Sequence, residues 1–248
     1  MLPLLLLIIL VGLVILLIRK WQQRSTINRW RRALDLEQHH ATFQQLYADL
    51  DGFALSKAAR TSQDAIEYVY GEIIFEPFIA LLSLCKPNSS TIFYDLGSGT
   101  GKAVLACAMV FDVKKSCGIE LFASLCQSAK AQQQRLKEIP VYQARATRIE
   151  FKQGNIIGTP FDEATLIFIN ATAFFGENWQ AISKQVEQVK PGCLVISTSK
   201  SLVSNLFTTL RVTQVTMTWG IVDAYIQERI GNCDEKITQA KIDLASSQ

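Results

Sequence analysis

Histidine and paired cysteine are scarce in this chain of 248 residues. Its two histidines, His39 and His40, are neighbours in a polar segment, and its six cysteines are scattered without a C-x-x-C pair. A histidine-based catalytic triad and a zinc site are therefore not expected, and no metal is predicted. Unpaired cysteines within apolar runs are typical of proteins in a reducing compartment.

Acidic residues are missing from the first 34 positions, where an apolar run precedes a basic one. Residues 2–18 carry no charge, and six basic residues lie between Arg19 and Arg32. A run of this length is the lower limit for crossing a hydrocarbon core of about 30 Å. The pattern predicts a single-pass membrane anchor at 1–18. The rest of the chain would then lie on the cytoplasmic or matrix side, where basic flanks stay.

Two other interpretations of this end remain open. A cleaved signal peptide also contains an apolar run, although its basic segment usually comes before that run. The basic residues of 19–32 can form a solvated linker instead of contacting anionic head groups.

Excess basic charge is absent from the remainder of the chain. Without the six basic residues near the N-terminus, 19 Lys and Arg remain against 22 Asp and Glu. A nucleic-acid-binding domain usually carries clustered basic residues. Nucleic acid is therefore not an expected partner.

The length predicts one substantial domain with an appendage. The sequence has no internal repeat and no low-complexity tract. We expect a membrane anchor at 1–18, a basic and helical linker at 19–64, the main domain at 65–232 and a tail at 233–248.

Strand and helix patterns alternate from Glu72 onward. Strand-like runs are expected at 91–97, 116–121, 148–156, 165–170 and 193–199, with helices between them. Two final runs, 211–219 and 221–230, are separated by one glycine and predict an antiparallel hairpin. The predicted fold class is α/β. It is a Rossmann-like, seven-stranded sheet of the class I methyltransferase type, with helices on both faces, a C-terminal hairpin and a preceding transmembrane helix.

A glycine-rich loop, DLGSGTG at residues 95–101, connects the first predicted strand to a helix. Its G-x-G-x-G follows an aspartate directly and differs from the G-x-G-x-x-G of dinucleotide-binding loops. A P-loop would need wider glycine spacing before Lys102 and a Ser or Thr in place of Ala103. The loop is typical of S-adenosylmethionine enzymes, because glycines let the backbone approach a ligand closely.

The second predicted strand ends in GIEL, which places Glu120 at its carboxyl tip. Ligands of open α/β sheets bind at this edge, where an acid can accept hydrogen bonds from both ribose hydroxyls. A solvated strand-end acid is the alternative.

Several stretches resemble the non-SET histone lysine methyltransferases, the family named for disruption of telomeric silencing. In order and spacing they are YGEI (70–73), FYDLGSGTG (93–101), GIEL (118–121) and FINATAFFGENW (168–179). The stretch 215–227, VTMTWG followed by DAYIQ, is similar to the closing hairpin of that family. The resemblance covers about residues 65–230. It implies S-adenosylmethionine as the cofactor and a protein lysine as the acceptor.

The resemblance also implies roles for single residues. Asn170 would stand beside the reactive methyl group, Phe174 would form a wall of the lysine channel, and Tyr70 would fold over the methionine end of the donor. Asn155 would face the adenine. The full set implied to bind the donor is Tyr70, Glu72, Asp95, Gly97, Ser98, Gly99, Gly101, Lys102, Glu120, Asn155 and Asn170.

Three positions depart from the pattern of the family. Ile73 stands where the family has Thr, Asn155 where it has Asp, and NATAF replaces NNFAF, so that Thr172 takes the place of an aromatic residue. Because of these changes, the resemblance does not determine which molecule accepts the methyl group. A membrane protein or a basic segment near the bilayer is an expected substrate. A small-molecule or lipid methyltransferase and a non-catalytic donor-binding module are the alternatives.

Overall fold

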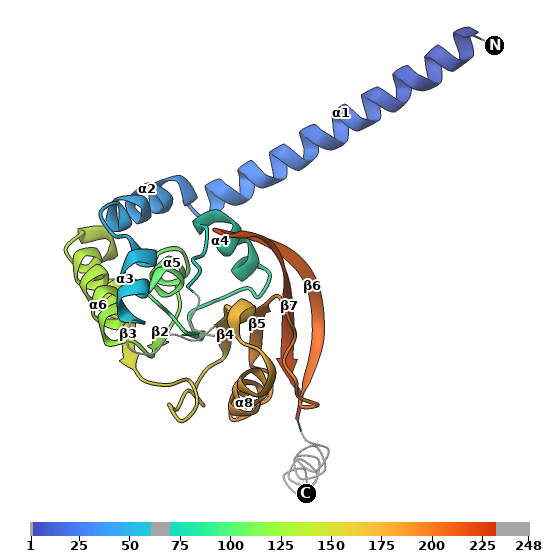
Figure 1. Ribbon diagram of the computed structural model, residues 1–248. Coiled ribbons are helices and arrows are strands. Elements are labelled where there is room, and N and C mark those ends of the chain that lie inside the picture. Colours follow the sequence, from blue (N-terminus) through green and yellow to red (C-terminus); the bar gives the residue numbers. More distant parts are fainter. Residues whose placement is uncertain (1, 61–69, 232–248) are drawn as a thin grey trace, which may run out of the picture.

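One mixed sheet with helices on both faces forms the domain (Figure 1). A computed structural model describes residues 2–60 and 70–231, and within its first helix it describes the side chains of Leu10 and of residues from Gly12 onward. The strand order is β3-β2-β1-β4-β5-β7-β6. The strands are β1 Ile92–Leu96, β2 Lys115–Glu120, β3 Ile149–Gln153, β4 Leu166–Ile169, β5 Leu194–Thr198, β6 Phe207–Met217 and β7 Gly220–Arg229. The predicted seven-stranded class I arrangement is confirmed.

The central strands are buried on both faces, because successive side chains of a strand point to opposite sides. Phe93 of β1 joins one core with helices α4, α5, α6 and α7, whereas Tyr94 and Leu96 join the other core with α8. The helices are α4 Phe75–Ser83, α5 Lys102–Val110, α6 Ala123–Lys137, α7 Gln143–Ala146 and α8 Gly176–Val186. A continuous apolar run such as TIFY suits a strand that is covered on both sides.

Parallel pairing of β1 with β2 and with β4 brings the carboxyl ends of these strands to one edge of the sheet. The last two strands form the predicted antiparallel hairpin, with a register shift between Thr209 and Arg211. β6 begins at Phe207, earlier than expected. β3 ends at Gln153, earlier than the predicted 156, and Asn155 turns the chain by accepting a hydrogen bond from the Ile157 N–H at 2.9 Å.

Three described helices come before α4 in the chain: α1 Leu2–Ala33, α2 Leu36–Tyr47 and α3 Gly52–Ala59. The basic segment expected as a linker belongs to α1, whose last turns contact α4. Trp30 donates its indole N–H to the Ser83 hydroxyl at 3.3 Å, and Arg31 pairs with Glu76 at 2.6 Å. The end of α1 is therefore attached to the domain.

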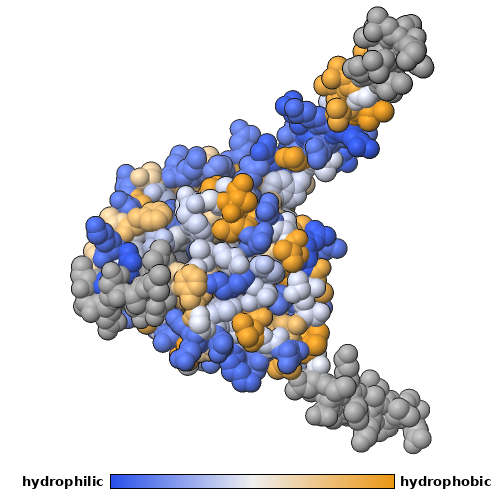
Figure 2. Space-filling model, turned by 45° about the vertical axis from the view of Figure 1, so that its right-hand side comes forward, coloured by the Kyte–Doolittle hydropathy of each residue, from blue (hydrophilic) through white to orange (hydrophobic). Residues whose placement is uncertain are grey.

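Beyond these contacts α1 projects from the domain (Figure 1). Figure 2 shows hydrophobic side chains toward its free end and a hydrophilic band between them and the domain. Among the described residues, no helix combines the length and the apolar character that spanning a bilayer requires. The predicted anchor at 1–18 falls largely on side chains outside that part, and the predicted tail at 233–248 lies wholly outside it.

Candidate active site

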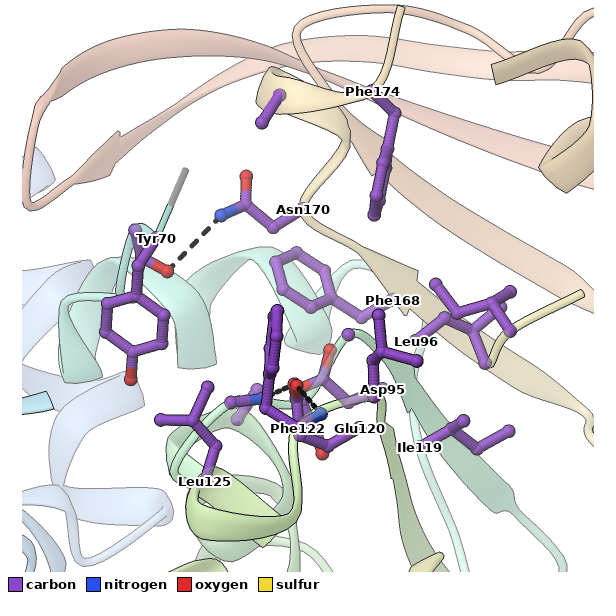
Figure 3. A pocket seen from close by; sticks show the side chains of 18 of the residues that line it. Tyr70, Asp95, Leu96, Ile119, Glu120, Phe122, Leu125, Phe168, Asn170 and Phe174 are labelled. Carbon is purple, nitrogen blue, oxygen red and sulfur yellow. Dashed lines mark hydrogen bonds between the residues drawn. The ribbon is translucent and has the colours of Figure 1, made fainter. Parts of the chain in front are cut away.

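A pocket opens at the carboxyl ends of β1, β2 and β4, where motifs far apart in the sequence meet (Figure 3). All the predicted site residues line it except Gly101. Those on its wall are Tyr70, Glu72, Asp95, Gly97, Ser98, Gly99, Lys102, Glu120, Asn155, Asn170 and Phe174. We call residues 95–99 with Glu120 the donor wall, and residues 170–174 the acceptor wall. The binding roles of the single residues stay predictions.

The glycine loop makes a tight turn against β2. The N–H groups of Gly97 and Ser98 both donate to the Ile119 carbonyl oxygen at 2.9 Å. Gly99 has a φ of +52°, and a Cβ at this position would lie 2.7 Å from the ring of Tyr70. Glycine is required here, because only a residue without a Cβ combines this conformation with so close an approach.

Two other loop residues contribute to packing. Gly101 has a φ of +83°, and a Cβ there would lie 2.6 Å from Phe151 and 2.9 Å from Ala129. Its glycine therefore lets α5 begin close to the core, and Gly101 does not line the pocket. The hydroxyl of Ser98 is buried against Gly118 and has no hydrogen-bond partner among the described residues.

Glu120 is buried at the tip of β2 and holds the two loops beside it. One carboxylate oxygen accepts from the Gly99 N–H at 2.8 Å and the other from the Phe122 N–H at 2.9 Å. Burial raises the pKa of Glu120, and these backbone donors oppose the rise. A carboxylate has about four acceptor positions, so each oxygen can still accept a ribose hydroxyl.

Asp95 lies at the end of β1, 4% exposed. Burial and, to a lesser degree, the charge of Glu120 raise the pKa of Asp95 to about 8. Two carboxyl groups close together in a buried site resist ionising together.

A polar network joins the YGE segment to the start of α5. The Tyr70 hydroxyl donates to Glu72 Oε1 at 2.9 Å, and Lys102 Nζ donates to Glu72 Oε2 at 2.5 Å. Burial, with the Glu72 charge as a second cause, raises the pKa of Tyr70. Tyr47 of α2 donates to the Thr100 carbonyl at 3.1 Å. The network presents a paired cation and anion to the pocket.

The hairpin turn holds the same segment from its other side. The Thr218 N–H donates to the Glu72 carbonyl at 3.1 Å, and Ile73 forms an isolated antiparallel bridge with Met217. Trp219 packs so closely on Gly71 that a Cβ there would lie 2.3 Å from the indole. The hairpin therefore fixes the YGE segment over the pocket.

Asn170 follows β4 and begins the acceptor wall. Its Nδ2 donates to the Gly71 carbonyl at 3.4 Å, drawn as a dashed line in Figure 3, and its Oδ1 accepts from Thr198 Oγ1 at 2.9 Å. Phe174 stacks on Trp179 with ring centroids 6.5 Å apart and planes 3° from parallel. The two walls face each other, since a Cβ at Gly97 would lie 4.0 Å from the Phe174 ring.

Apolar residues that sequence reasoning missed complete the pocket. Phe122 and Leu125 come from the start of α6, and Ile156 follows β3. Phe122 could have been predicted from its position, because it is an aromatic residue only two positions after Glu120. Near them the exposed side chain of Asn155 accepts a hydrogen bond from the Ile157 N–H.

These groups fit S-adenosylmethionine. Glu120 would hold the ribose, Phe122 and Ile156 would enclose the base, and the Glu72 and Lys102 charges would match an amino-acid end. Among the residues that the structure describes, no group of three or more His, Cys, Asp or Glu side chains is placed to hold a metal ion.

Solved structures share the fold. TrmN from Thermus thermophilus aligns with a TM-score of 0.51 at 15% identity, over 62% of this chain and 48% of that one. Geranyl diphosphate C-methyltransferase from Streptomyces coelicolor A3(2), in a complex that contains S-adenosyl-L-homocysteine, aligns with a TM-score of 0.50 at 10% identity. That alignment covers 62% of this chain and 75% of the other. Fold and site together define a class I methyltransferase.

The chain belongs to the family described as "Histone methylation protein DOT1", whose model matches residues 56–225. The family confirms the resemblance stated from the motifs, the predicted enzyme class and S-adenosylmethionine as the methyl donor.

Curated relatives carry the name "Histone-lysine N-methyltransferase, H3 lysine-79 specific". The protein of Gibberella zeae is 27% identical over 54% of this chain and 29% of its own length, and that of Candida glabrata is 25% identical over 52% and 21%. The protein of Caenorhabditis elegans is 30% identical over 53% of this chain and 15% of its own. The alignments thus span less than a third of each relative.

Proposed function

We propose that the protein is an S-adenosylmethionine-dependent protein lysine N-methyltransferase. The observation that carries this proposal is the position of the acceptor wall directly opposite the donor wall in one pocket. Membership of the DOT1 family and the names of its relatives support lysine as the acceptor. Histone H3 is the substrate named for those relatives and serves here as a first probe.

When bound, S-adenosylmethionine supplies a methyl group attached to a positively charged sulfur. A neutral amine can take this methyl group in one step, and the sulfur leaves as the neutral thioether of S-adenosylhomocysteine. The chain contributes alignment, which accounts for much of the rate in such a reaction. A lysine amine must be neutral to react, although its ordinary pKa is about 10.4, and a desolvated channel lowers that pKa. Asn170 Oδ1 has a second lone pair beside the one used by Thr198 and can orient an amine N–H.

The test uses the full chain with methyl-labelled donor and histone H3, and locates the label by mass spectrometry. We expect label on lysine Nζ. Asn170→Ala should lower transfer by about 100-fold, with donor affinity changed less than about threefold, because the amide faces the acceptor. Asn205→Ala, an exposed asparagine away from the pocket, is the matched control.

Other results identify the alternatives. If the label appears in added lipid or a small molecule and not in protein, the acceptor class proposed here is wrong. If the donor binds but no transfer to any of these occurs, the chain is a donor-binding module. Both alternatives are considered because Thr172, a small residue in the acceptor wall, takes the place of an aromatic residue of the family.

We further propose that α1 attaches the enzyme to an anionic membrane, with the domain on the cytoplasmic or matrix side. The uncharged run of 2–18 and the basic residues after it support this, as do exposed side chains such as Leu13 and Leu16, 55% and 63% exposed. The full chain should float with vesicles containing phosphatidylserine, and a chain lacking 1–18 should not. Full-length protein that stays with the soluble fraction would refute attachment.

A further inference from the structure

Three consecutive residues at the end of β5 each contact a different part of the acceptor wall. They are Thr198, Ser199 and Lys200, and their partners lie between Asn170 and Phe174. More than 20 positions separate the two segments, so the contacts depend on the parallel pairing of β4 with β5. That pairing places the ends of both strands side by side.

Thr198 determines how the Asn170 amide is oriented. Its hydroxyl donates to Asn170 Oδ1 at 2.9 Å and accepts from the Ala171 N–H at 3.1 Å. The Gly71 carbonyl can only accept, so the amide presents its nitrogen to Gly71 and its oxygen to Thr198, whose hydroxyl proton then holds that oxygen in place. Thr198 is fully buried, so water does not compete for these bonds.

Ser199 holds the next position of the wall in a strained backbone conformation. Its φ is +69°, a left-handed value that costs energy for a residue other than glycine. Its N–H donates to the Asp223 carbonyl at 2.7 Å, and its hydroxyl lies 2.8 Å from the Thr172 hydroxyl. The strained turn directs this side chain to the wall, and strain of this kind often occurs at functional sites.

Lys200 contacts the far end of the wall. Its ammonium donates to the Phe174 carbonyl and lies 4.0 Å from the centre of the Phe175 ring. Its own backbone is fixed, since its carbonyl accepts from Ser197 Oγ at 2.7 Å. Partial burial lowers the pKa of Lys200, consistent with an ammonium group removed from full hydration.

We propose that residues 198–200 are positioning residues that set the geometry of the acceptor wall, with Thr198 orienting the Asn170 amide and Lys200 fixing the backbone at Phe174. The inference rests on the proposed function, because it assigns this geometry to methyl transfer. The two walls of the pocket would then be held by different strands: the donor wall by β2, and the acceptor wall by the end of β5.

The experiment compares Thr198→Val, which keeps the shape and removes the hydroxyl, with Thr198→Ser, which keeps the hydroxyl. Thr91→Val is the matched control, since Thr91 is also a buried threonine with a hydroxyl hydrogen bond but precedes β1 at the other end of that strand. The full chain is labelled with ¹⁵N-asparagine, and Asn170→Asp identifies the Asn170 side-chain signal. Donor affinity and transfer to histone H3 are measured on the same samples.

We expect Thr198→Val to shift the Asn170 amide signal and to lower kcat about tenfold, with donor Kd changed less than about twofold. Thr198→Ser should restore both, and Thr91→Val should change neither. Lys200→Met should mainly raise KM for the protein acceptor, and Lys200→Arg should reverse part of that rise. An Asn170 amide signal that is the same in Thr198→Val and wild type would overturn the inference.

The proposed methyl transfer and the orienting role of Thr198 can be refuted separately. If wild type transfers no methyl group while Thr198→Val still shifts the Asn170 amide, the proposed function is wrong and the orienting hydrogen bond is supported. If transfer occurs and Thr198→Val lowers donor affinity as much as kcat, Thr198 acts on the whole pocket and is not an acceptor-side positioning residue.

Discussion

The donor wall and the acceptor wall are built in different ways. The donor wall is a short loop whose N–H groups bond to the adjacent strand, at Ile119 and Glu120. The acceptor wall depends on contacts from the 198–200 segment and from Gly71. Both walls form where neighbouring parallel strands end, but the first is held by its own backbone N–H groups, whereas the second is held mainly by side chains of the 198–200 segment.

This difference predicts that mutations separate the two walls functionally. Changes in the donor wall should alter donor affinity and leave the Asn170 amide as it is. Changes at the end of β5 should alter transfer and leave donor affinity as it is.

Gly97→Arg should abolish donor binding, with an affinity loss greater than about 100-fold. Gly97 has a φ of +88° and lines the pocket, so the new side chain would be strained and would enter the space for the donor. Gly192→Arg is a matched control, since Gly192 has a φ of +87° with open space around it and lies outside the pocket lining. Calorimetric titration of the donor into both variants distinguishes a side chain that fills the pocket from backbone strain alone as the cause of lost affinity. An equal loss of donor affinity in both variants would refute the role of Gly97 in the pocket.

Lys102→Met should weaken donor binding by roughly 10- to 100-fold, because an ammonium that can face the donor carboxylate is lost. It should also lower the free energy of unfolding by about 3 kcal/mol, because Glu72 is left buried without its cation. The double variant Glu72→Gln with Lys102→Met should recover stability and not affinity. If stability and donor affinity both recovered, the ion pair of Glu72 and Lys102 would stabilise the fold without binding the donor.

Asp95→Asn should flatten part of the dependence of donor-free stability on pH. The folded pKa of Asp95 is raised to about 8 from an ordinary 3.8, so the folded chain binds the proton more tightly. The free energy of unfolding should therefore fall as pH rises from about 4 to 8, and Asp95→Asn should lack that contribution. Urea denaturation at pH 5 and pH 8 measures it. Asp162→Asn, an exposed aspartate, is the control, and equal slopes in wild type and Asp95→Asn would contradict the assignment.

Asn155→Asp should change donor affinity by less than about threefold. Either side chain can accept from the Ile157 N–H and preserve the turn after β3. The exposed position limits the effect of the added charge. Asn155→Ala removes the turn bond and should have the larger effect. The reverse order in a donor titration would show that the amide nitrogen contacts the base.

Much of the donor wall could be predicted from the sequence because its signals are local. A buried strand, a glycine-rich turn and an acid at the tip of the next strand each follow from residues close together in the chain. The position of Gly101 could not be predicted from the loop: it lies against Phe151, at the start of α5, and does not line the pocket. Sequence pattern cannot tell a glycine that faces a ligand from one that faces the core.

The supports of the acceptor wall could not be predicted in this way. Thr198, Ser199 and Lys200 look like an ordinary polar end to an apolar strand, and only the β4 and β5 register places them beside residues 170–174. Phe122 was missed for a related reason, because an aromatic residue at a helix start is common in cores. Family resemblance supplied Asn170 and Phe174 themselves, but not what holds them.

The most direct test of the donor pocket is a calorimetric titration of S-adenosylmethionine into the full chain and into Glu120→Gln. Glutamine replaces one of the oxygens that accept from Gly99 and Phe122 with an N–H donor. We predict one binding site in wild type and an affinity at least about tenfold lower in the variant, with both proteins folded. A folded wild-type chain that does not bind the donor, or a Glu120→Gln variant that binds it equally well, would contradict the account.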